Sequence, residues 1–240
     1  MSSTGAGRDS GCTAGFVLTG ASLLPPSLGS RLVGLEHLSE RYAEHNRLER
    51  GAGFVFAGSE RVELFRRYVG GPGRRVLDLG CRDGALTQAY ATGNEVVGVD
   101  ADRDALAEAA RRGIETHWAD LDQALTFDDA SFDVVVAGEV LEHLRDPQRL
   151  VRDARRVLRP GGTLVGSVPN AYRLKGRLLF LFGRPPENDP THLQMFSGAD
   201  VQALLAGLEE PHVHFVAGRL VPLHPRLFAN DIVFAGRKPR

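Results

Sequence analysis

Residues 74–100 read RRVLDLGCRDGALTQAYATGNEVVGVD. The apolar run near its start, residues 76–79, has the length of a parallel strand that is buried on both faces. A second apolar run at residues 95–99 reads as another strand, and we expect a helix between the two, at residues 85–90. The order of strand, helix and strand predicts a parallel βαβ unit.

Four residues of this stretch point to a ligand. Asp78 lies inside the first strand, where a carboxylate is costly unless it has a partner. Gly80 and Gly84 bracket a tight turn, whose backbone N–H groups suit a negatively charged or carboxylate-bearing ligand. Asp100 closes the second strand, where an acid can accept hydrogen bonds from both ribose hydroxyls of a nucleotide. The stretch therefore predicts a nucleotide-like ligand at the carboxyl edge of the sheet.

The sequence DLGCRDG at residues 78–84 resembles motif I of the class I S-adenosylmethionine (SAM) methyltransferases, D-x-G-x-G-x-G. It differs from the G-x-G-x-x-G of the dinucleotide enzymes. Arg82 stands where the middle glycine of the methyltransferase pattern is usual. Because glycine there lets the backbone approach the ligand closely, the Arg82 side chain must point away or contact the ligand's carboxylate.

The segment FDVVVAGEVLEHLRDPQRLVRDARRVLRPGGTLVGSVPN, residues 132–170, is similar to the segments that follow motif I in this family. It predicts a strand at 132–137, a helix at 147–158, an R-P-G-G turn and a strand at 163–168. With motif I, the resemblance covers residues 60–170. It implies an α/β fold with a Rossmann-like, seven-stranded, mostly parallel sheet, helices on both faces and an antiparallel last strand.

Outside that region the pattern is weaker. Helices are expected at 60–69 and 200–208, and strands at 212–217 and 227–235. A helix at 35–50 carries Tyr42 and, in this fold, often covers the cofactor pocket. The alternative for Tyr42 is an ordinary surface position.

The resemblance implies that SAM is the cosubstrate and binds at the carboxyl ends of the strands. The cofactor-binding residues that it implies are Asp78, Gly80, Arg82, Gly84, Asp100, Ala101, Asp120, Leu121 and Glu139. Asp120 follows a third strand at 114–118 and fits a hydrogen bond to the adenine amino group. The alternative for Asp120 is the N-cap of a short helix.

Two histidines are the candidate catalytic residues. Methyl transfer requires in-line alignment, exclusion of water and, for a hydroxyl acceptor, a base such as histidine. His192 lies in the insertion at 171–196, which we expect to form a lid over the acceptor, and His143 follows the fourth strand. The alternative for His192 is a structural histidine that bonds loop backbone. His143 is expected to touch the cofactor or to shape the floor of the pocket.

Glu139, Glu142 and His143 form an E-x-x-E-H pattern, which places the three side chains on one face of a helical turn. Two carboxylates and an imidazole so placed could hold a divalent cation. The pattern is similar to that of the quinone-biosynthesis O-methyltransferases, which are thought to use a metal. We favour the interpretation without a metal, in which solvated acids lie beside one residue that contacts the cofactor.

Residues 171–187, AYRLKGRLLFLFGRPPE, are apolar from 178 to 182 and basic on both sides of that run. One interpretation is a lid over a hydrophobic acceptor. A second is an interfacial segment, residues 171–184, that makes weak contact with a membrane. The third is a helix packed on the core with solvated bases.

Composition sets the remaining bounds. The 240 residues predict one domain at 31–240 after a mobile tail at 1–30. A net charge of −1 offers no global field for nucleic acid or an anionic membrane. Cys12 and Cys81 lie far apart, which indicates a reducing compartment, and we expect the cytoplasm. Because no apolar run is long enough to span a bilayer, we expect no stable membrane insertion.

The expected function is methyl transfer from SAM to an oxygen, or with less support a nitrogen, of a small-molecule acceptor. Natural products, sugars and quinone precursors are the acceptor classes considered, and the oligomeric state is left open. The alternative is a SAM-fold protein that binds and regulates another biosynthetic enzyme. It rests on a likeness of S-x-P-N, residues 171–187 and THLQMFS to a small methionine-biosynthesis protein that acts mainly as the partner of an acyltransferase.

Overall fold

The structure is a computed structural model and describes residues 28–49, 58–186, 189 and 191–240. The predicted tail and Cys12 lie outside the described residues, except that the first helix already begins at Leu28. The domain boundary expected at residue 30 stays a prediction.

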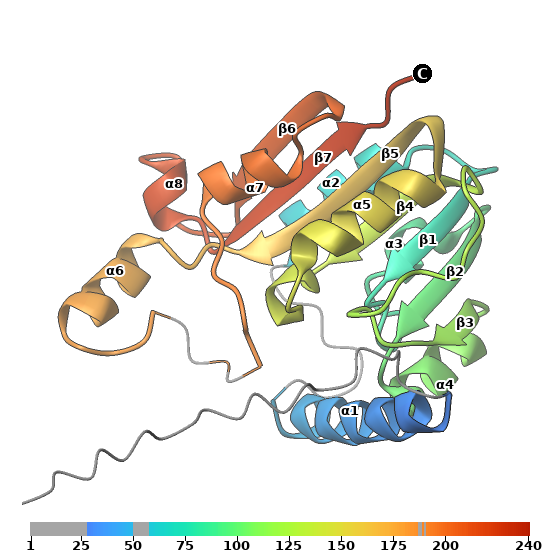
Figure 1. Cartoon of the computed structure of the whole chain (residues 1–240). Helices are drawn as coiled ribbons and strands as arrows, with labels where there is room; N and C mark the ends of the chain where they lie inside the picture. The colour runs from blue at the N-terminus through green and yellow to red at the C-terminus, as the bar shows by residue number, and fades with distance from the viewer. Residues whose placement is uncertain (1–27, 50–57, 187–188, 190) are drawn as a thin grey trace, which may run out of the picture.

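A seven-stranded sheet with the order β3-β2-β1-β4-β5-β7-β6 forms the centre of the molecule (Figure 1). The strands are β1 (Arg75–Leu79), β2 (Glu95–Asp100), β3 (Glu115–Trp118), β4 (Phe132–Gly138), β5 (Leu158–Pro169), β6 (Glu209–Val216) and β7 (Asp231–Arg237). β7 runs antiparallel to β5 and β6, and the other neighbouring strands are parallel. The predicted Rossmann-like architecture is confirmed, including the antiparallel last strand.

Helices cover both faces of this sheet. They are α1 (Leu28–Glu49), α2 (Gly58–Val69), α3 (Gln88–Ala91), α4 (Arg103–Arg111), α5 (Pro147–Val157), α6 (Leu174–Leu181), α7 (Gly198–Leu204) and α8 (Pro225–Phe228), with a 3-10 turn η1 (Leu141–His143) after β4. In Figure 1, α5 and α7 lie on one face and α2 and α3 on the other. α1 lies along the end of the molecule beside α4, at the edge where β1 and β2 end.

β1 shows why the sequence forms this sheet. Leu77 and Leu79 pack into the core on the side of α5 and α7, whereas Val76 packs with Phe65 of α2 and Tyr90 of α3 on the other side. Successive strand residues point to opposite faces, and both faces are covered. The strand therefore reads as an apolar run that contains Asp78, rather than as an alternation of apolar and polar residues.

Two local predictions are wrong in detail. The helix expected at 85–90 is shorter, since α3 spans Gln88–Ala91 and the Asp83 side chain instead accepts a hydrogen bond from the Ala85 backbone N–H at 3.2 Å. The R-P-G-G segment is a bulge within β5 rather than a turn before it. There the pairing with β4 passes from Leu158 to Thr163, and the Gly161 N–H bonds the Lys238 carbonyl at 2.9 Å.

Candidate active site

A cavity of about 1320 Å³ lies at the carboxyl ends of β1, β2 and β4, where open α/β sheets bind their ligands. Seven of the nine predicted cofactor-binding residues line it: Gly80, Arg82, Asp100, Ala101, Asp120, Leu121 and Glu139. Both candidate catalytic histidines, His143 and His192, line it too. The cavity exceeds the usual 300–1,000 Å³ of a site for one small ligand, so it has room for a nucleoside and a second molecule.

Asp100, at the end of β2, is held by the backbone. Its Oδ2 accepts a hydrogen bond from the Arg82 N–H and its Oδ1 one from the Asp102 N–H, each at 2.8 Å. Burial raises the pKa of Asp100 to about 6, although these backbone hydrogen bonds act in the opposite direction. Each carboxylate oxygen has a further lone pair, so Asp100 can still accept hydrogen bonds from a ligand in the cavity.

The turn after β1 is built for close approach. Gly80 has φ +74°, and a Cβ on it would lie 2.9 Å from Val140 Cγ2, which leaves no room for a side chain. Arg82 has φ +50°, the left-handed backbone that the glycine of the family pattern adopts without cost. For arginine this conformation costs roughly 1–2 kcal/mol. Strain of this kind gathers at functional sites, and here it directs the Arg82 N–H to Asp100.

Asp78 and Gly84, the other two predicted cofactor-binding residues, lie outside the cavity wall. Asp78 is 3% exposed and faces α3, where its Oδ2 accepts hydrogen bonds from Thr87 Oγ1 at 2.6 Å and Tyr90 Oη at 2.7 Å. A Cβ on Gly84 would lie 2.5 Å from Ile114 Cδ1, so Gly84 permits the turn to pack against the segment that leads into β3. Both residues stabilise the turn on the side away from the cavity.

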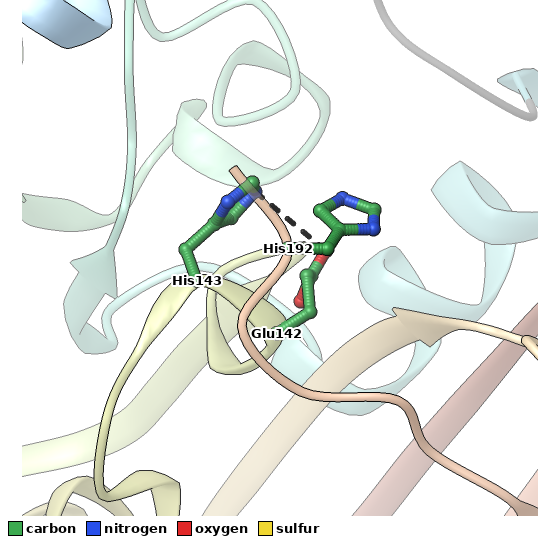
Figure 2. A group of neighbouring side chains, drawn as sticks. All are labelled: Glu142, His143 and His192. Carbon is green, nitrogen blue, oxygen red and sulfur yellow. Dashed lines mark ion pairs between the residues drawn. The ribbon is translucent and has the colours of Figure 1, made fainter. Parts of the chain in front are cut away.

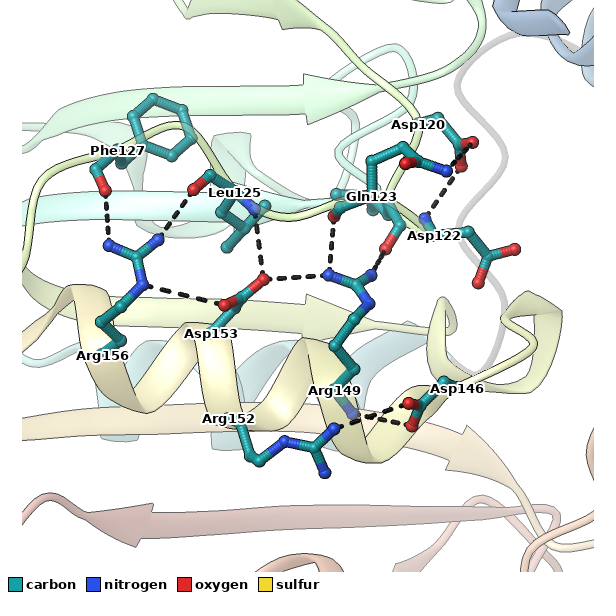
Figure 3. A network of polar contacts seen from close by, with 11 residues as sticks. Asp120, Asp122, Gln123, Leu125, Phe127, Asp146, Arg149, Arg152, Asp153 and Arg156 are labelled. Atoms are coloured by element: carbon teal, nitrogen blue, oxygen red, sulfur yellow. Dashed lines mark hydrogen bonds and ion pairs between the residues drawn. The ribbon is translucent and has the colours of Figure 1, made fainter. Parts of the chain in front are cut away.

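The loop after β3 is fastened by α5 (Figure 3). Asp120 Oδ1 accepts a hydrogen bond from the Asp122 N–H at 2.8 Å, so Asp120 shapes its own turn as well as lining the cavity. Arg149 donates to the carbonyls of Gln123, at 2.7 Å, and Leu121. The predicted site did not include Arg149, because nothing in the sequence shows that α5 lies beside this loop.

Further along α5, Asp153 and Arg156 continue this network. Asp153 Oδ2 accepts from Arg149 Nη1 at 2.9 Å and from the Leu125 N–H at 3.2 Å, and Arg156 donates to the carbonyls of Leu125 and Phe127. The three side chains of α5 therefore set the path of the chain from Leu121 to Phe127 (Figure 3).

Arg61 of α2 is a site residue that the sequence did not indicate. It lines the cavity, is 3% exposed, and its Nη1 lies 3.1 Å from Oε1 of Glu139. Glu139 itself has φ +54°, a second strained residue at the cavity. Nε and Nη1 of Arg61 are buried and make no hydrogen bond to the described residues that meets the angular criteria, although Nη1 forms the ion pair with Glu139. A guanidinium at a cavity wall suits a carboxylate ligand.

The two histidines meet although 49 positions separate them in the chain. Their ring centroids are 4.8 Å apart and the rings are inclined at 72°. His143 Nδ1 lies 3.1 Å from the Thr191 carbonyl, and His192 Nε2 lies 3.6 Å from Asp189 Oδ2. The ring of Tyr42, from α1, meets His143 edge-on with centroids 5.9 Å apart. Tyr42 thus lines the cavity rather than an open surface.

Glu142 lies beneath this pair (Figure 2). Ligand atoms of Glu142, His143 and His192 all lie within 4.8 Å of one another. Glu139 is directed to Arg61 instead, so the structure does not bring together the predicted set of Glu139, Glu142 and His143. A metal with bonds of about 2.0–2.2 Å needs ligand atoms closer than roughly 4.4 Å. The ligand atoms of these three side chains would have to come closer to one another to hold a metal. The absence of a metal stays a prediction.

Parts of the segment 171–196 lie at the rim of the cavity. Leu179 of α6 lines it, as do Arg173 and Lys175, and the Leu193 N–H bonds the Glu142 carbonyl at 2.7 Å.

No helix among the described residues is long and apolar enough to cross a membrane.

Comparisons with known proteins point to methyltransferases. Residues 77–166 match the family model described as Methyltransferase domain. A protein named a probable S-adenosylmethionine-dependent methyltransferase, from Mycolicibacterium smegmatis, is 36% identical over 142 residues, which are 57% of this chain and 52% of that protein. A ubiquinone biosynthesis O-methyltransferase of Coxiella burnetii is 32% identical over 117 residues, 46% of this chain and 50% of that one. The chain spans about half the length of these curated relatives.

The solved structures show the fold. A SAM-dependent methyltransferase from Archaeoglobus fulgidus has a TM-score of 0.64 and 20% identity, covering 82% of this chain and 99% of that one. The matched family region holds motif I, Asp100, Asp120 and the chain as far as residue 166, within β5. Residues 77–166 therefore match a methyltransferase domain, and the chain is similar to S-adenosylmethionine-dependent methyltransferases in sequence and to class I members in fold.

Proposed function

We propose that the protein transfers a methyl group from SAM to an oxygen of a small-molecule acceptor. The observation that carries the proposal is one cavity lined both by the carboxylate of Asp100 and by the imidazoles of His143 and His192. The first suits a ribose, and the second suits an acceptor that must lose a proton.

Three groups of the chain fit the cosubstrate. Asp100 accepts hydrogen bonds from the ribose hydroxyls, Asp120 accepts one from the adenine amino group, and Arg61 binds the carboxylate of the methionine end. When bound, SAM supplies an electrophilic methyl group on a sulfonium, which departs as a neutral thioether. What remains for the chain is to align the acceptor, exclude water and accept a proton.

His192 is the proposed general base. Asp189, 3.6 Å from His192 Nε2, would stabilise the imidazolium that forms when the hydroxyl proton is taken up. The oxygen of the acceptor then forms its bond to the methyl carbon as the carbon–sulfur bond breaks. An amine acceptor needs only to be unprotonated and requires no base. The presence of His192 beside Asp189 therefore favours an oxygen acceptor over a nitrogen one. The relative named as an O-methyltransferase supports the same choice.

Asp100→Asn tests the cosubstrate site. The amide keeps one acceptor oxygen and replaces the other by a donor, so SAM should bind roughly 10- to 100-fold more weakly, as expected when a hydrogen bond to a charged group is lost. Calorimetric titration with SAM and S-adenosylhomocysteine measures this. Asp104→Asn, the same chemical change at an exposed position of α4, is the control and should bind like the parent protein. Failure of the parent protein to bind either ligand would overturn the proposal.

Arg149→Met should weaken SAM binding without touching the ligand. Without the guanidinium the carbonyls of Leu121 and Gln123 lose their donor, and the loop that carries Asp120 is no longer held on α5. We expect affinity to fall by roughly 5- to 30-fold and unfolding free energy by about 1–3 kcal/mol. Arg152→Met is the matched control on the same helix, because that side chain is exposed and, among the residues that the structure describes, pairs only with Asp146, at 3.5 Å. Equal effects of the two changes would show that Arg149 does not position the loop.

Transfer itself is tested in a cell extract supplied with isotopically labelled SAM, with products identified by mass. The parent protein should label a small molecule and Asp100→Asn should label it far more slowly. If no small molecule is labelled and a second enzyme co-purifies in equal amount, the chain is a binding partner, as the alternative function predicts.

A further inference from the structure

We infer that the protein docks on an anionic lipid surface through α6 and the segment 218–229, here called the basic-apolar surface. α6 follows β5 and α8 precedes β7, and both protrude at the same side of the molecule (Figure 1). The two segments are joined where they leave the sheet, because Asn170 Nδ2 donates a hydrogen bond to the Arg226 carbonyl at 3.1 Å and Arg173 donates one to Asn230 Oδ1.

The apolar part of this surface is unusually exposed. Phe180, Leu181 and Phe182 are 74%, 74% and 77% exposed, and Leu223 on the neighbouring segment is 76% exposed. Gly176 is the only buried residue of α6. Three consecutive large apolar side chains in water are costly, at about 25 cal/mol for each Å² exposed, so α6 is not a helix packed on the core.

The charge of this surface specifies the partner. Residues 171–186 contain four bases and no acid, and residues 218–229 contain two bases and no acid. The whole chain has 29 bases and 30 acids, so this separation of charge is local. Arg177 and Arg184 flank the exposed phenylalanines and are themselves exposed. Apolar side chains that insert beside basic ones match the boundary between acyl chains and anionic headgroups.

The basic-apolar surface adjoins the cavity. Leu179 and Lys175 of α6 line the cavity, while Phe180 and Phe182, one residue to either side of Leu181, face outward. If the proposed function holds, an acceptor dissolved in the lipid surface would reach His192 past α6. Docking itself depends only on the exposed side chains, so it can be tested without SAM or acceptor.

The experiment uses the full chain and two kinds of vesicle, phosphatidylcholine alone and phosphatidylcholine with phosphatidylglycerol in equal parts. We expect co-sedimentation with the anionic vesicles only, weakening as salt is raised. Arg177→Gln with Arg184→Gln should lower the partition coefficient roughly 25-fold, because each base near such a surface contributes about fivefold. Phe180→Ser with Phe182→Ser should reduce it further, to the level of the phosphatidylcholine control.

The matched control is Arg111→Gln with Arg152→Gln, which removes two exposed bases from α4 and α5 and should bind anionic vesicles like the parent protein. All variants should keep the parent's affinity for SAM, which shows that they fold and separates this test from that of the proposed function. Equal binding to both vesicles, or equal loss in the control variant, would overturn the inference. So would absence of vesicle binding together with a dimer that the phenylalanine substitutions dissociate, since the surface would then join two copies of the chain.

Discussion

His192→Ala is expected to lower kcat by roughly 10²–10⁴-fold, the usual contribution of a general base. His192 lines the cavity, its side chain is 11% exposed, and Asp189 is placed to stabilise its protonated form. The affinity for SAM should change by no more than a few-fold, because Asp100, Asp120 and Arg61 are untouched. Single-turnover kinetics with the acceptor found by extract labelling would measure the loss, at several pH values on both sides of neutrality.

His37→Ala is the control for this prediction, since the same residue type there is 77% exposed on α1. His143→Ala should instead weaken SAM binding or stability, because His143 contacts Tyr42 and the Thr191 carbonyl. A chelator should leave the parent rate unchanged. If His192→Ala keeps the parent kcat and the chelator abolishes activity, the cluster of Glu142, His143 and His192 acts through a metal and the base is not His192.

Much of the fold was open to prediction because its central strands are buried on both faces. β1 and β4 read as mostly apolar runs for that reason, although each contains an aspartate, and the segments between the strands have helical length. The departures are local. The R-P-G-G segment has turn residues, yet Lys238, 77 positions after Gly161, pairs with it and keeps it in the sheet as a bulge. No local pattern shows a partner that distant.

The candidate site was predicted where a motif fixes the position of a residue at a strand end, as for Asp100 and Asp120. It was not predicted where helices contribute from elsewhere. Arg61 and Tyr42 reach the cavity from α2 and α1, and helical spacing shows which face of a helix is apolar but not which site it packs beside. His143 and His192 were each candidates, whereas their contact depends on the path of the loop from Asp189 to His192.

Asp78 shows a limit of a different kind. Its place in motif I predicted a cofactor contact. When both faces of a strand are buried, however, the sequence does not show toward which face a given side chain points. The side chain shares a face with Val76 and bonds Thr87 and Tyr90. We therefore propose that Asp78 supports the motif I turn through α3 and does not touch the ligand.

Substitutions of Asp78 should separate its charge from its hydrogen bonds. Asp78→Asn keeps an acceptor oxygen for the buried hydroxyls of Thr87 and Tyr90, whereas Asp78→Ala leaves both donors without one. Each buried unsatisfied donor costs roughly 1–3 kcal/mol, so Asp78→Ala should unfold at a free energy about 2–6 kcal/mol below that of Asp78→Asn. Urea unfolding measures both. Titration with SAM should show near-parent affinity for Asp78→Asn, and a large loss there would place Asp78 at the ligand.

The charge of Asp78 should appear in the pH dependence of stability. Burial raises the pKa of Asp78 from its ordinary value of 3.8 to about 6, against the hydrogen bonds from Thr87 and Tyr90. The folded state therefore holds the proton more tightly than the unfolded state, so the stability from this group is complete below about pH 3.8 and is lost as the pH rises through about 6. The gap between the two pKa values corresponds to about 3 kcal/mol.

Asp78→Asn cannot titrate, so its unfolding free energy should gain on that of the parent protein, by up to about 3 kcal/mol, as the pH rises from about 4 to about 7. Above that range the difference should stay constant. Asp100, whose pKa burial also raises to about 6, is present in both proteins and cancels from the comparison. Parallel stability curves for the two proteins across this range would mean that Asp78 titrates alike in the folded and unfolded chain, and that its burial against α3 costs the carboxylate nothing.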